Sequence, residues 1–418
     1  MSGKFGDLGI DMARFRADIE ALARIGRTEN GGLFRPAFGA AYEEARAWLL
    51  DRIAAAGLAG RNDPAGNVIA HVGPNEGPVV MSGSHIDTVP DGGPLDGAYG
   101  VLAALECARV IKDCGRAPVR AFEACAFADE EGHYLGCFGS AALTGQLDAG
   151  RLAAARNFEG RSLADAMRAA GFDPDRALGA ARAPGEIAAY AELHIEQGPV
   201  LEREGVPIGV VTAIIGTRHR ELRFLGQADH AGTTPMNARR DAFMGAAEYA
   251  TRARALVLAE GAPDTVLTFG IIEARPQAVN IVPEQVRLTQ EMRDIDNDLL
   301  DRMARETRTL AESVAADHRL ALECDEGYAT TPSPMAPSMR ARIKAAADHL
   351  GLAAREMPSG AGHDAGFFAR VTETGMIFVP SEGGRSHRRD EWTDWPALEA
   401  GANTLLHTLL PLVFDAEK

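Results

Sequence analysis

Continuous apolar runs alternate with helix-like periodicity through the first half of the chain. Apolar residues that recur every three or four positions predict a helix, and a short unbroken apolar run bounded by turn residues predicts a buried strand. On this basis we expect helices at 42–56 and 99–112, and strands at 67–72, 79–84, 119–127, 188–195 and 208–215. This alternation is typical of an α/β fold in which helices flank a mixed, mostly parallel sheet.

The pattern changes from about Gly216 onward. The expected order here is strand, helix, strand, strand, helix and strand, at 221–225, 241–258, 265–272, 285–292, 299–315 and 320–324. This order is the split βαβ arrangement of ferredoxin-like α+β domains. The Thr-, Pro- and Ser-rich segment 330–338 is expected to be a linker that returns the chain to the first domain. Two helices, at 339–350 and 395–409, and a short strand at 376–379 follow it.

The length of 418 residues exceeds what one hydrophobic core usually supports, which favours two domains. We expect one domain to be formed by residues 1–215 and 330–418, and a second domain to be inserted between them at 216–329. The hydrophobic fraction of 46% and the charged fraction of 24% are ordinary for a globular protein.

The net charge limits which kinds of partner the protein can bind, and the cysteine content indicates its cellular compartment. The formal net charge of −16 argues against nucleic acid or an anionic membrane surface as a partner, since both attract basic surfaces, and it favours a small molecule. The five cysteines are scattered without CxxC spacing, as expected in a reducing compartment. The N-terminus resembles an amphipathic helix rather than a signal peptide, and we expect no membrane span. We therefore expect a cytoplasmic protein.

The first candidate site residues follow a predicted strand, in GSHIDTVPDGGPLDG. On an extended segment His85 and Asp87 project to the same side, so the Asp87 carboxylate could orient the imidazole of a metal-binding histidine. Asp96 lies eleven residues after His85 in a glycine-rich loop and could bridge two ions. The alternative is a surface loop with turn-forming Asp and Gly.

Three further segments carry candidate ligands. FADEEGH places Glu130 and Glu131 after a buried strand, where adjacent carboxylates repel one another unless they share a cation or a proton; the alternative is a solvated acidic turn. ELHIEQG contains His194 and RSHRRDEWT contains His387, each of which could instead be an ordinary structural or loop histidine. Together, three histidines and the carboxylates suit a binuclear site for Zn²⁺, Mn²⁺, Co²⁺ or Ni²⁺ that hydrolyses an amide.

Nearly the whole chain resembles the hydantoinase/carbamoylase family of metal-dependent amidases, which are relatives of aminoacylases and di-zinc peptidases. The matching blocks are GSHIDTVPDGGPLDGAYGVLAALE, FADEEGH with CFGS, ELHIEQGPVLE, ADHAGTTPMNARRDA, VNIVP, MRDID, SGAGHDA and RSHRRDEWT. The resemblance implies a di-zinc peptidase-like catalytic domain with an inserted lid and dimerisation domain. It implies that His85, Asp96 and His194 bind one divalent metal ion, and that Asp96, Glu131 and His387 bind the other.

The same resemblance implies roles for other residues. Glu130 is expected to be the general base, taking a proton from the attacking water and delivering it to the leaving nitrogen. Asp87 is expected to orient His85, and His230 in the lid to stabilise the developing oxyanion. The expected substrate-binding residues are Gln197 for the ureido group, Asn280 and Arg293 for the substrate carboxylate, and Arg218 and Gly362. His363 and Asp364 are expected to shape the metal site without binding metal.

Two departures from the family pattern concern the substrate side chain. Relatives commonly carry Ser-Arg-Phe after the paired glutamates, whereas this chain has His133, Tyr134 and Leu135. The usual aromatic residue after GxR at the lid entry is replaced by His219 in GTRHREL. Both departures leave the expected metal ligands intact.

The resemblance implies that the enzyme hydrolyses the amide C–N bond of an N-carbamoyl L-amino acid and releases the amino acid, carbon dioxide and ammonia. Close alternatives are an allantoate or ureidoglycine amidohydrolase and a β-ureidopropionase. More remote alternatives are an aminoacylase or dipeptidase and a non-catalytic ureide-binding relative. The inserted domain is expected to pair two subunits into a homodimer.

Overall fold

The computed structural model describes residue 6 and residues 8–415. The chain divides into two compact units. The first unit contains the chain up to Thr212 and from Pro334 onward, and the second unit is Ala213–Ser333. The ranges 1–215, 216–329 and 330–418 expected from the sequence lie within a few residues of these bounds.

The first unit is built on a nine-stranded mixed sheet of order β1-β2-β4-β3-β5-β13-β6-β11, with β12 also paired to β6. Its three central ladders, β4/β3, β3/β5 and β5/β13, are parallel. The ladders β1/β2, β2/β4 and β13/β6 are antiparallel. The strands are β1 (Ala59–Asn62), β2 (Val68–Val72), β3 (Val79–His85), β4 (Phe122–Phe127), β5 (Ile187–Ile195), β6 (Ile208–Ile214), β11 (Ser333–Pro334), β12 (Ala354–Ser359) and β13 (Glu373–Val379).

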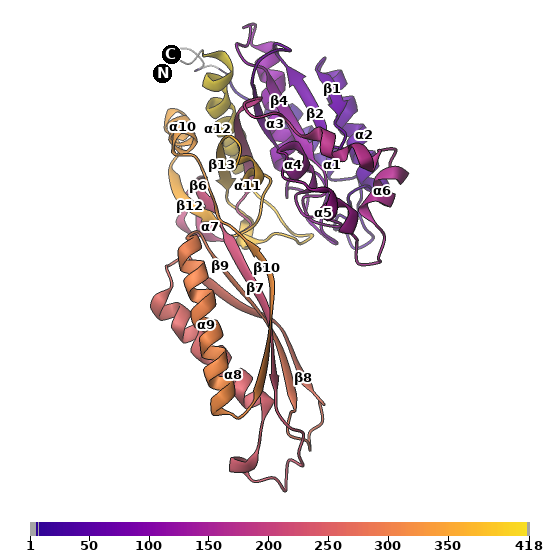
Figure 1. Cartoon of the computed structure of the whole chain (residues 1–418). Helices are drawn as coiled ribbons and strands as arrows, with labels where there is room; N and C mark the ends of the chain where they lie inside the picture. The colour runs from indigo at the N-terminus through magenta and orange to yellow at the C-terminus, as the bar shows by residue number, and fades with distance from the viewer. Residues whose placement is uncertain (1–5, 7, 416–418) are drawn as a thin grey trace. The chain divides into compact units, whose positions relative to one another are not determined.

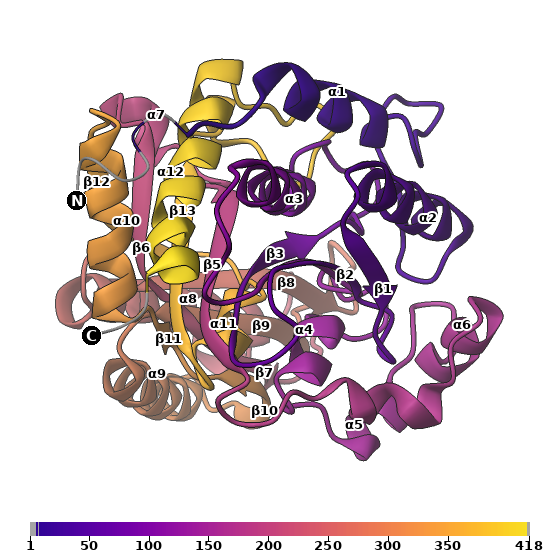
Figure 2. The ribbon, with the colours of Figure 1, turned by 90° about the horizontal axis from the view of Figure 1, so that it is seen from above.

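Helices cover this sheet, and α3 (Ala98–Asp113) and α12 (Trp395–Phe414) lie together on one face of it (Figure 2). Every residue of β3 and β4 is buried, as expected for central strands with helices on both faces. The other α-helices of this unit are α1 (Met12–Leu22), α2 (Ala40–Ala55), α4 (Phe138–Leu143), α5 (Ala149–Ala154), α6 (Leu163–Ala169), α7 (Val200–Glu204), α10 (Pro337–His349) and α11 (Ala365–Phe368).

The C-terminal helix α12 is longer and more apolar than the sequence pattern predicts. Asp394 caps it by accepting the Ala397 backbone N–H, and the helix continues five residues beyond the expected end at 409. By length and composition it could cross a membrane, whereas the sequence predicts a shorter helix at 395–409 and no membrane span. However, 67% of its apolar window is buried, and it packs on α3, β5 and β13. It therefore has the properties of a core helix of the first unit.

The second unit is a four-stranded antiparallel sheet with two helices on one face (Figure 1). Its elements are β7 (Gly216–Leu225), α8 (Ala242–Glu260), β8 (Val266–Arg275), β9 (Gln285–Asp294), α9 (Asn297–Asp317) and β10 (Ala321–Thr330). The strand order β10-β7-β9-β8 is that of a ferredoxin-like fold. Asp241 and Asp296 cap the two helices by accepting backbone N–H groups of their first turns. Apolar residues of α8 and α9 pack on those of β7 and β9 to form a separate core.

The segment 330–338 is not simply a linker. Strand β10 continues to Thr330, the short strand β11 follows, and α10 begins at Pro337. The chain therefore returns to the first unit with little irregular structure.

Candidate metal centre

The candidate ligands gather where parallel strands of the first unit end. Strand β3 ends at His85, β5 carries His194 near its end, and β4 leads into the loop that contains Glu130 and Glu131. Because these neighbouring strands are parallel, their carboxyl ends lie at the same edge of the sheet. The loop before α3 adds Asp96, which is almost fully buried.

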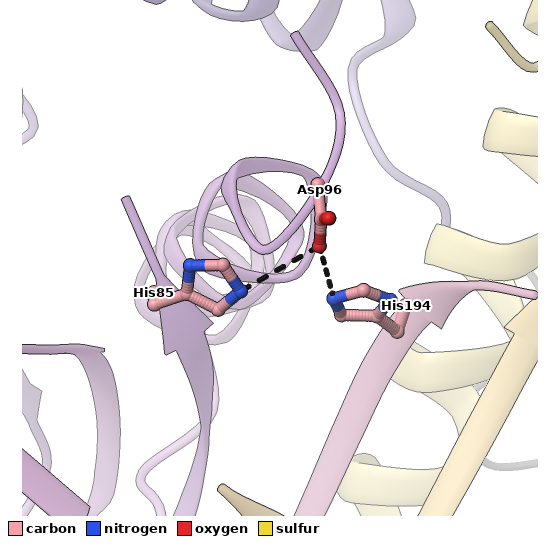
Figure 3. A group of neighbouring side chains, drawn as sticks. All are labelled: His85, Asp96 and His194. Carbon is pink, nitrogen blue, oxygen red and sulfur yellow. Dashed lines mark ion pairs between the residues drawn. The ribbon is translucent and has the colours of Figure 1, made fainter. Parts of the chain in front are cut away.

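His85, Asp96 and His194 form the first group of potential ligands (Figure 3). Oδ1 of Asp96 lies 3.6 Å from Nε2 of His85 and 3.1 Å from Nε2 of His194. The Nδ1 atoms of the two histidines lie 3.0 Å from the carbonyl oxygen of Asp87 and 2.9 Å from that of Ile195. Donation from Nδ1 to these carbonyls selects the tautomer whose Nε2 lone pair faces Asp96, as metal binding requires.

Asp96, Glu131 and His387 form the second group. Nε2 of His387 lies 3.1 Å from Oδ2 of Asp96 and 3.6 Å from Oε2 of Glu131. The two oxygens of Asp96 therefore face different groups, and within each group all ligand atoms lie within 4.8 Å of one another. The side chain of His387 is 51% exposed, whereas the ligands of the first group are buried.

The electrostatics of the site favour a cation. Burial raises the pKa of Glu131 to about 7, and the neighbouring Asp96 acts in the same direction. Although burial opposes protonation of His85, Glu130 and Asp96 raise the pKa of this imidazole well above its usual value. Oε1 of Glu131 is buried without a hydrogen-bond partner among the residues that the structure describes. Several buried carboxylates lie beside imidazole nitrogens here, and such a set of groups is suited to binding a divalent metal ion.

Asp87 is placed differently from the simple expectation. Its carboxylate lies 3.7 Å from Nδ1 of His85, while its backbone carbonyl is closer to that nitrogen. The carboxylate instead accepts the backbone N–H groups of Glu130 and Glu131, at 3.4 and 3.1 Å. Asp87 thus links the loop after β3 to the loop after β4.

Glu130 belongs to neither ligand group but lies beside the first. Its Oε2 is 3.5 Å from Nε2 of His85, and its Oε1 accepts the thiol of Cys137 at 3.5 Å. The Cys137 backbone N–H also donates to the Glu130 carbonyl, at 3.0 Å. Burial raises the pKa of Glu130 well above its usual value. A buried carboxyl next to the potential ligands can accept and release a proton.

Two residues that sequence reasoning did not assign hold Asp96 in place. Oε1 of the buried Glu391 accepts the backbone N–H groups of Leu95 and Asp96, at 3.1 and 3.0 Å. Ser386 donates to Glu391 or to Oδ2 of Asp96, at 3.0 and 3.2 Å. Both lie in RSHRRDEWT, the segment that also contains His387.

Gln197 also reaches this centre. Its side-chain nitrogen donates to Oδ2 of Asp96 at 3.1 Å and to Ser386 at 3.2 Å. The ring of His363 lies 4.6 Å from that of His194, and its Nε2 is 3.0 Å from the Ser359 hydroxyl. His363 and the buried Asp364 lie outside both ligand groups, and Gly362 is exposed.

The remaining candidates belong to the second unit. His230 and Asn280 are exposed and lie on adjacent segments, because the Asn280 carbonyl accepts the Ala231 backbone N–H and residues 230 and 281 form a β-bridge. Arg218 binds Asp301 and Asn297 of α9, both at 2.8 Å, which favours a structural role for its guanidinium.

Arg293 lies on the other face of this sheet. Its Nε donates to Glu291 at 2.7 Å. Residues 217 and 293 are paired across β7 and β9, and Arg218, the next residue along β7, faces the helices. The structure therefore does not bring Arg218 and Arg293 to one face.

Comparisons with known proteins agree on one family. Residues 81–410 match the model of peptidase family M20/M25/M40. An N-carbamoyl-L-amino-acid amidohydrolase of Paenarthrobacter aurescens is 37% identical over 406 residues, which cover 96% of this chain and 97% of that protein. An allantoate amidohydrolase of Escherichia coli (strain K12) is 36% identical over 412 residues, which cover 97% of this chain and 100% of that protein.

A solved structure extends the match to the fold. The amidase of the hydantoinase/carbamoylase family from Burkholderia multivorans superposes with a TM-score of 0.90 at 32% identity, over 98% of this chain and 99% of that one. The chain belongs to this family. The expected family and fold are thereby confirmed, and this hydantoinase/carbamoylase family member is a hydrolase of C–N bonds other than peptide bonds. M20 enzymes are generally metal-dependent, in agreement with the ligand groups around Asp96.

Proposed function

We propose that this enzyme hydrolyses the amide C–N bond of an N-carbamoyl L-amino acid and releases the amino acid, carbon dioxide and ammonia. The observation that carries the proposal is the division of Asp96 between two ligand groups, with Oδ1 facing His85 and His194 and Oδ2 facing His387. This geometry supports two divalent metal ions, with Asp96 as the shared ligand and Glu131 completing the second group. Relatives of 37% and 34% identity that are named N-carbamoyl-L-amino-acid amidohydrolases support the substrate class.

The residues divide the chemistry between them. When bound, two divalent ions supply Lewis acidity to a carbonyl and lower the pKa of water. Glu130 takes the proton of the attacking water and delivers it to the leaving nitrogen, a role supported by its position beside His85 and outside both ligand groups. Asp87 holds the backbone that carries Glu130 and Glu131.

Substrate contacts are assigned by the chemistry of each side chain. Gln197 suits the ureido group because its amide can both donate and accept hydrogen bonds, and its Oε1 is buried without a partner within residues 8–415. Arg293 and Asn280 suit the substrate carboxylate, and His230 suits the developing oxyanion. Gly362 would admit substrate close to the backbone, since nothing lies within 4 Å of the position of a Cβ there.

The substrate can be tested by measuring ammonia release from a panel of ureido acids. The panel contains N-carbamoyl L-amino acids, allantoate, ureidoglycine and β-ureidopropionate, each with Mn²⁺, Co²⁺, Ni²⁺ or Zn²⁺. We expect the highest kcat/KM for an N-carbamoyl L-amino acid. Preference for allantoate would replace the proposal by the second candidate, which the 36% identical allantoate amidohydrolase favours. Turnover of only N-acyl amino acids or dipeptides would indicate an aminoacylase or peptidase.

We also propose that the enzyme is a cytoplasmic homodimer paired through the second unit. All five cysteines are free thiols, as is usual in a reducing compartment. Analytical ultracentrifugation should give a dimer. An active monomer at assay concentration would contradict the proposed homodimer. Secretion of the native protein would contradict the proposed cytoplasmic location.

A further inference from the structure

One face of the second unit's sheet carries a connected group of polar and aromatic side chains. On β7 and β9 the odd-numbered residues 219, 291 and 293 share this face, because His219 is paired with Glu291 and side chains alternate along a strand. The even-numbered Leu222 and Leu288 face the core formed with the two helices. Tyr328 of the neighbouring strand β10 lies on the same face as His219, since the two rings stack.

These side chains form a continuous series of contacts that includes Arg293. The rings of His219 and Tyr328 are stacked, with centroids 5.0 Å apart and planes inclined by 6°. The Tyr328 hydroxyl donates to Oε2 of Glu291 at 2.6 Å. The other carboxylate oxygen of Glu291 accepts Nε of Arg293 at 2.7 Å. Glu291 is therefore held between an aromatic hydroxyl and a guanidinium.

The backbone around Tyr328 is adapted to this stack. The pairing of β10 with β7 shifts register between Glu326 and Ala329, so that Gly327 and Tyr328 lie in an irregular part of the ladder. A Cβ at position 327 would overlap Nδ1 of His219, so a glycine here leaves room for the imidazole against the backbone of β10. That nitrogen is buried with no hydrogen-bond partner among residues 8–415, which indicates that the imidazole acts through packing.

Charge and hydrogen bonding keep Glu291 ionised. Burial opposes ionisation, but the Tyr328 hydroxyl and the Arg293 guanidinium outweigh it and lower the pKa of the Glu291 carboxyl. Burial and the adjacent Glu291 raise the pKa of Tyr328 to about 12, so the hydroxyl keeps its proton and remains a donor. Both shifts favour the hydrogen bond that the Tyr328 hydroxyl donates to the Glu291 carboxylate.

We propose that His219, Tyr328 and Glu291 are positioning residues that set the orientation of Arg293 for the substrate carboxylate. This inference rests on the proposed function, in which Arg293 binds that carboxylate. A guanidinium recognises a carboxylate through a planar fork, so its orientation matters as much as its charge. The Glu291 carboxylate accepts Nε of Arg293 and so orients the plane of the guanidinium. The Tyr328 hydroxyl holds Glu291 in place, and the stacking of Tyr328 on His219 holds Tyr328 in place. The imidazole of His219 supplies the flat surface on which the Tyr328 ring stacks.

The decisive variant is Tyr328→Phe, which keeps the stacked ring and removes only the hydroxyl. We expect KM for the best N-carbamoyl amino acid to rise about tenfold, the low end of what a hydrogen bond to a charged group contributes, while kcat stays within about twofold. The competitive inhibition constant of the corresponding N-carbamoyl amino acid amide should stay within about twofold, because the amide has no carboxylate to orient. If the variant were instead partly unfolded, KM for the substrate and the inhibition constant of the amide would both rise, or kcat would fall.

Tyr249→Phe is the matched control. It also removes a tyrosine hydroxyl that bonds to β9, but Tyr249 is buried whereas Tyr328 is exposed, and its partner is Gln290, on the helix-covered face next to Glu291. We expect this variant to leave KM unchanged. An equal rise of KM in both tyrosine variants would overturn the proposal, since the effect would then be one of general stability.

Variants at position 219 test the stack itself. His219→Phe should keep the wild-type KM, and His219→Ala should raise it as Tyr328→Phe does. The proposal is overturned if KM in both Tyr328→Phe and His219→Ala stays within about twofold of wild type while the wild-type enzyme cleaves ureido acids. If the wild-type enzyme cleaves no ureido acid with any metal, the proposed function itself has failed, so the two failures are distinguishable.

Discussion

The carboxylate of Asp87 accepts the backbone N–H of Glu131 at 3.1 Å. Asp87 lies two residues after the candidate ligand His85, in the loop after β3. Its carboxylate thereby fixes the backbone of the candidate ligand Glu131, in the loop after β4. The geometry of the first and second ligand groups is coupled through this contact. A change at Asp87 should therefore affect metal binding without removing any ligand atom.

We predict that Asp87→Ala weakens metal binding by about 10- to 100-fold, the usual effect of removing a group that orients ligands. Isothermal titration of the metal-free protein with Mn²⁺ or Zn²⁺ would measure this. Asp63→Ala is a suitable control, because Asp63 also accepts two backbone N–H groups in a loop, those of Ala65 and Asn67, but lies outside both ligand groups. Equal metal affinity in the Asp87 variant and wild type would contradict the coupling.

Removal of metal should destabilise the first unit. Binding of an ion to the folded state alone at 100 times its dissociation constant contributes about 2.7 kcal/mol of stability. We expect a chelator to lower the apparent melting temperature and added divalent metal to restore it. His387 is half exposed whereas His85 and His194 are buried, so the ion on the His387 side should leave first. Metal analysis during timed dialysis would reveal two steps, and a single step would argue against unequal positions.

Replacement of Glu130 by Gln should separate catalysis from metal binding. The amide is nearly isosteric and can still accept the Cys137 thiol, but it cannot take up a proton from water. We expect kcat to fall by at least about 100-fold, which is the lower range of general acid–base contributions. Metal content measured by mass spectrometry should equal that of wild type. If the variant keeps full turnover, Glu130 is not the general base.

Glu391 should matter for stability as well as for the site. Glu391→Ala leaves the backbone N–H groups of Leu95 and Asp96 without their acceptor, and each unsatisfied buried group costs about 1–3 kcal/mol. We predict a loss of about 2 kcal/mol or more in the free energy of unfolding of the first unit, measured by urea denaturation. Glu391→Gln keeps an acceptor oxygen and should lose less. Equal stability of the alanine variant and wild type would show that water replaces the carboxylate.

Much of the fold follows from local sequence patterns. Buried central strands such as β4 (FEACAF) and β13 (ETGMIFV) are rich in apolar residues, so their approximate positions are evident before any tertiary contact is known. Strand β1 is different: all four of its residues, AGRN, are exposed, and it exists because it pairs with β2 at the sheet edge. Nothing in its own residues favours a strand. The same holds for β12, whose sequence AREMPS shows no regular alternation.

The candidate site divides in a similar way. His85, Asp96 and His194 could be proposed from sequence because imidazole and carboxylate groups at strand ends have few other reasons to cluster. Glu391 accepts the backbone N–H of Asp96, and Ser386 donates to the Asp96 side chain, although both residues lie nearly 300 positions from Asp96 along the chain. Such contacts depend on the folded path of the chain and leave no spacing that a sequence pattern can reveal.

Gly97 has a φ of +63°, and a Cβ at this position would overlap the imidazole ring of His85. Every other residue type would thus displace a candidate ligand rather than adjust it. A descendant of this enzyme could keep all five candidate ligands and still lose its metal through one added methyl group. Position 97 is therefore a diagnostic position: a side chain there would mark a relative as inactive even when its ligand set is complete.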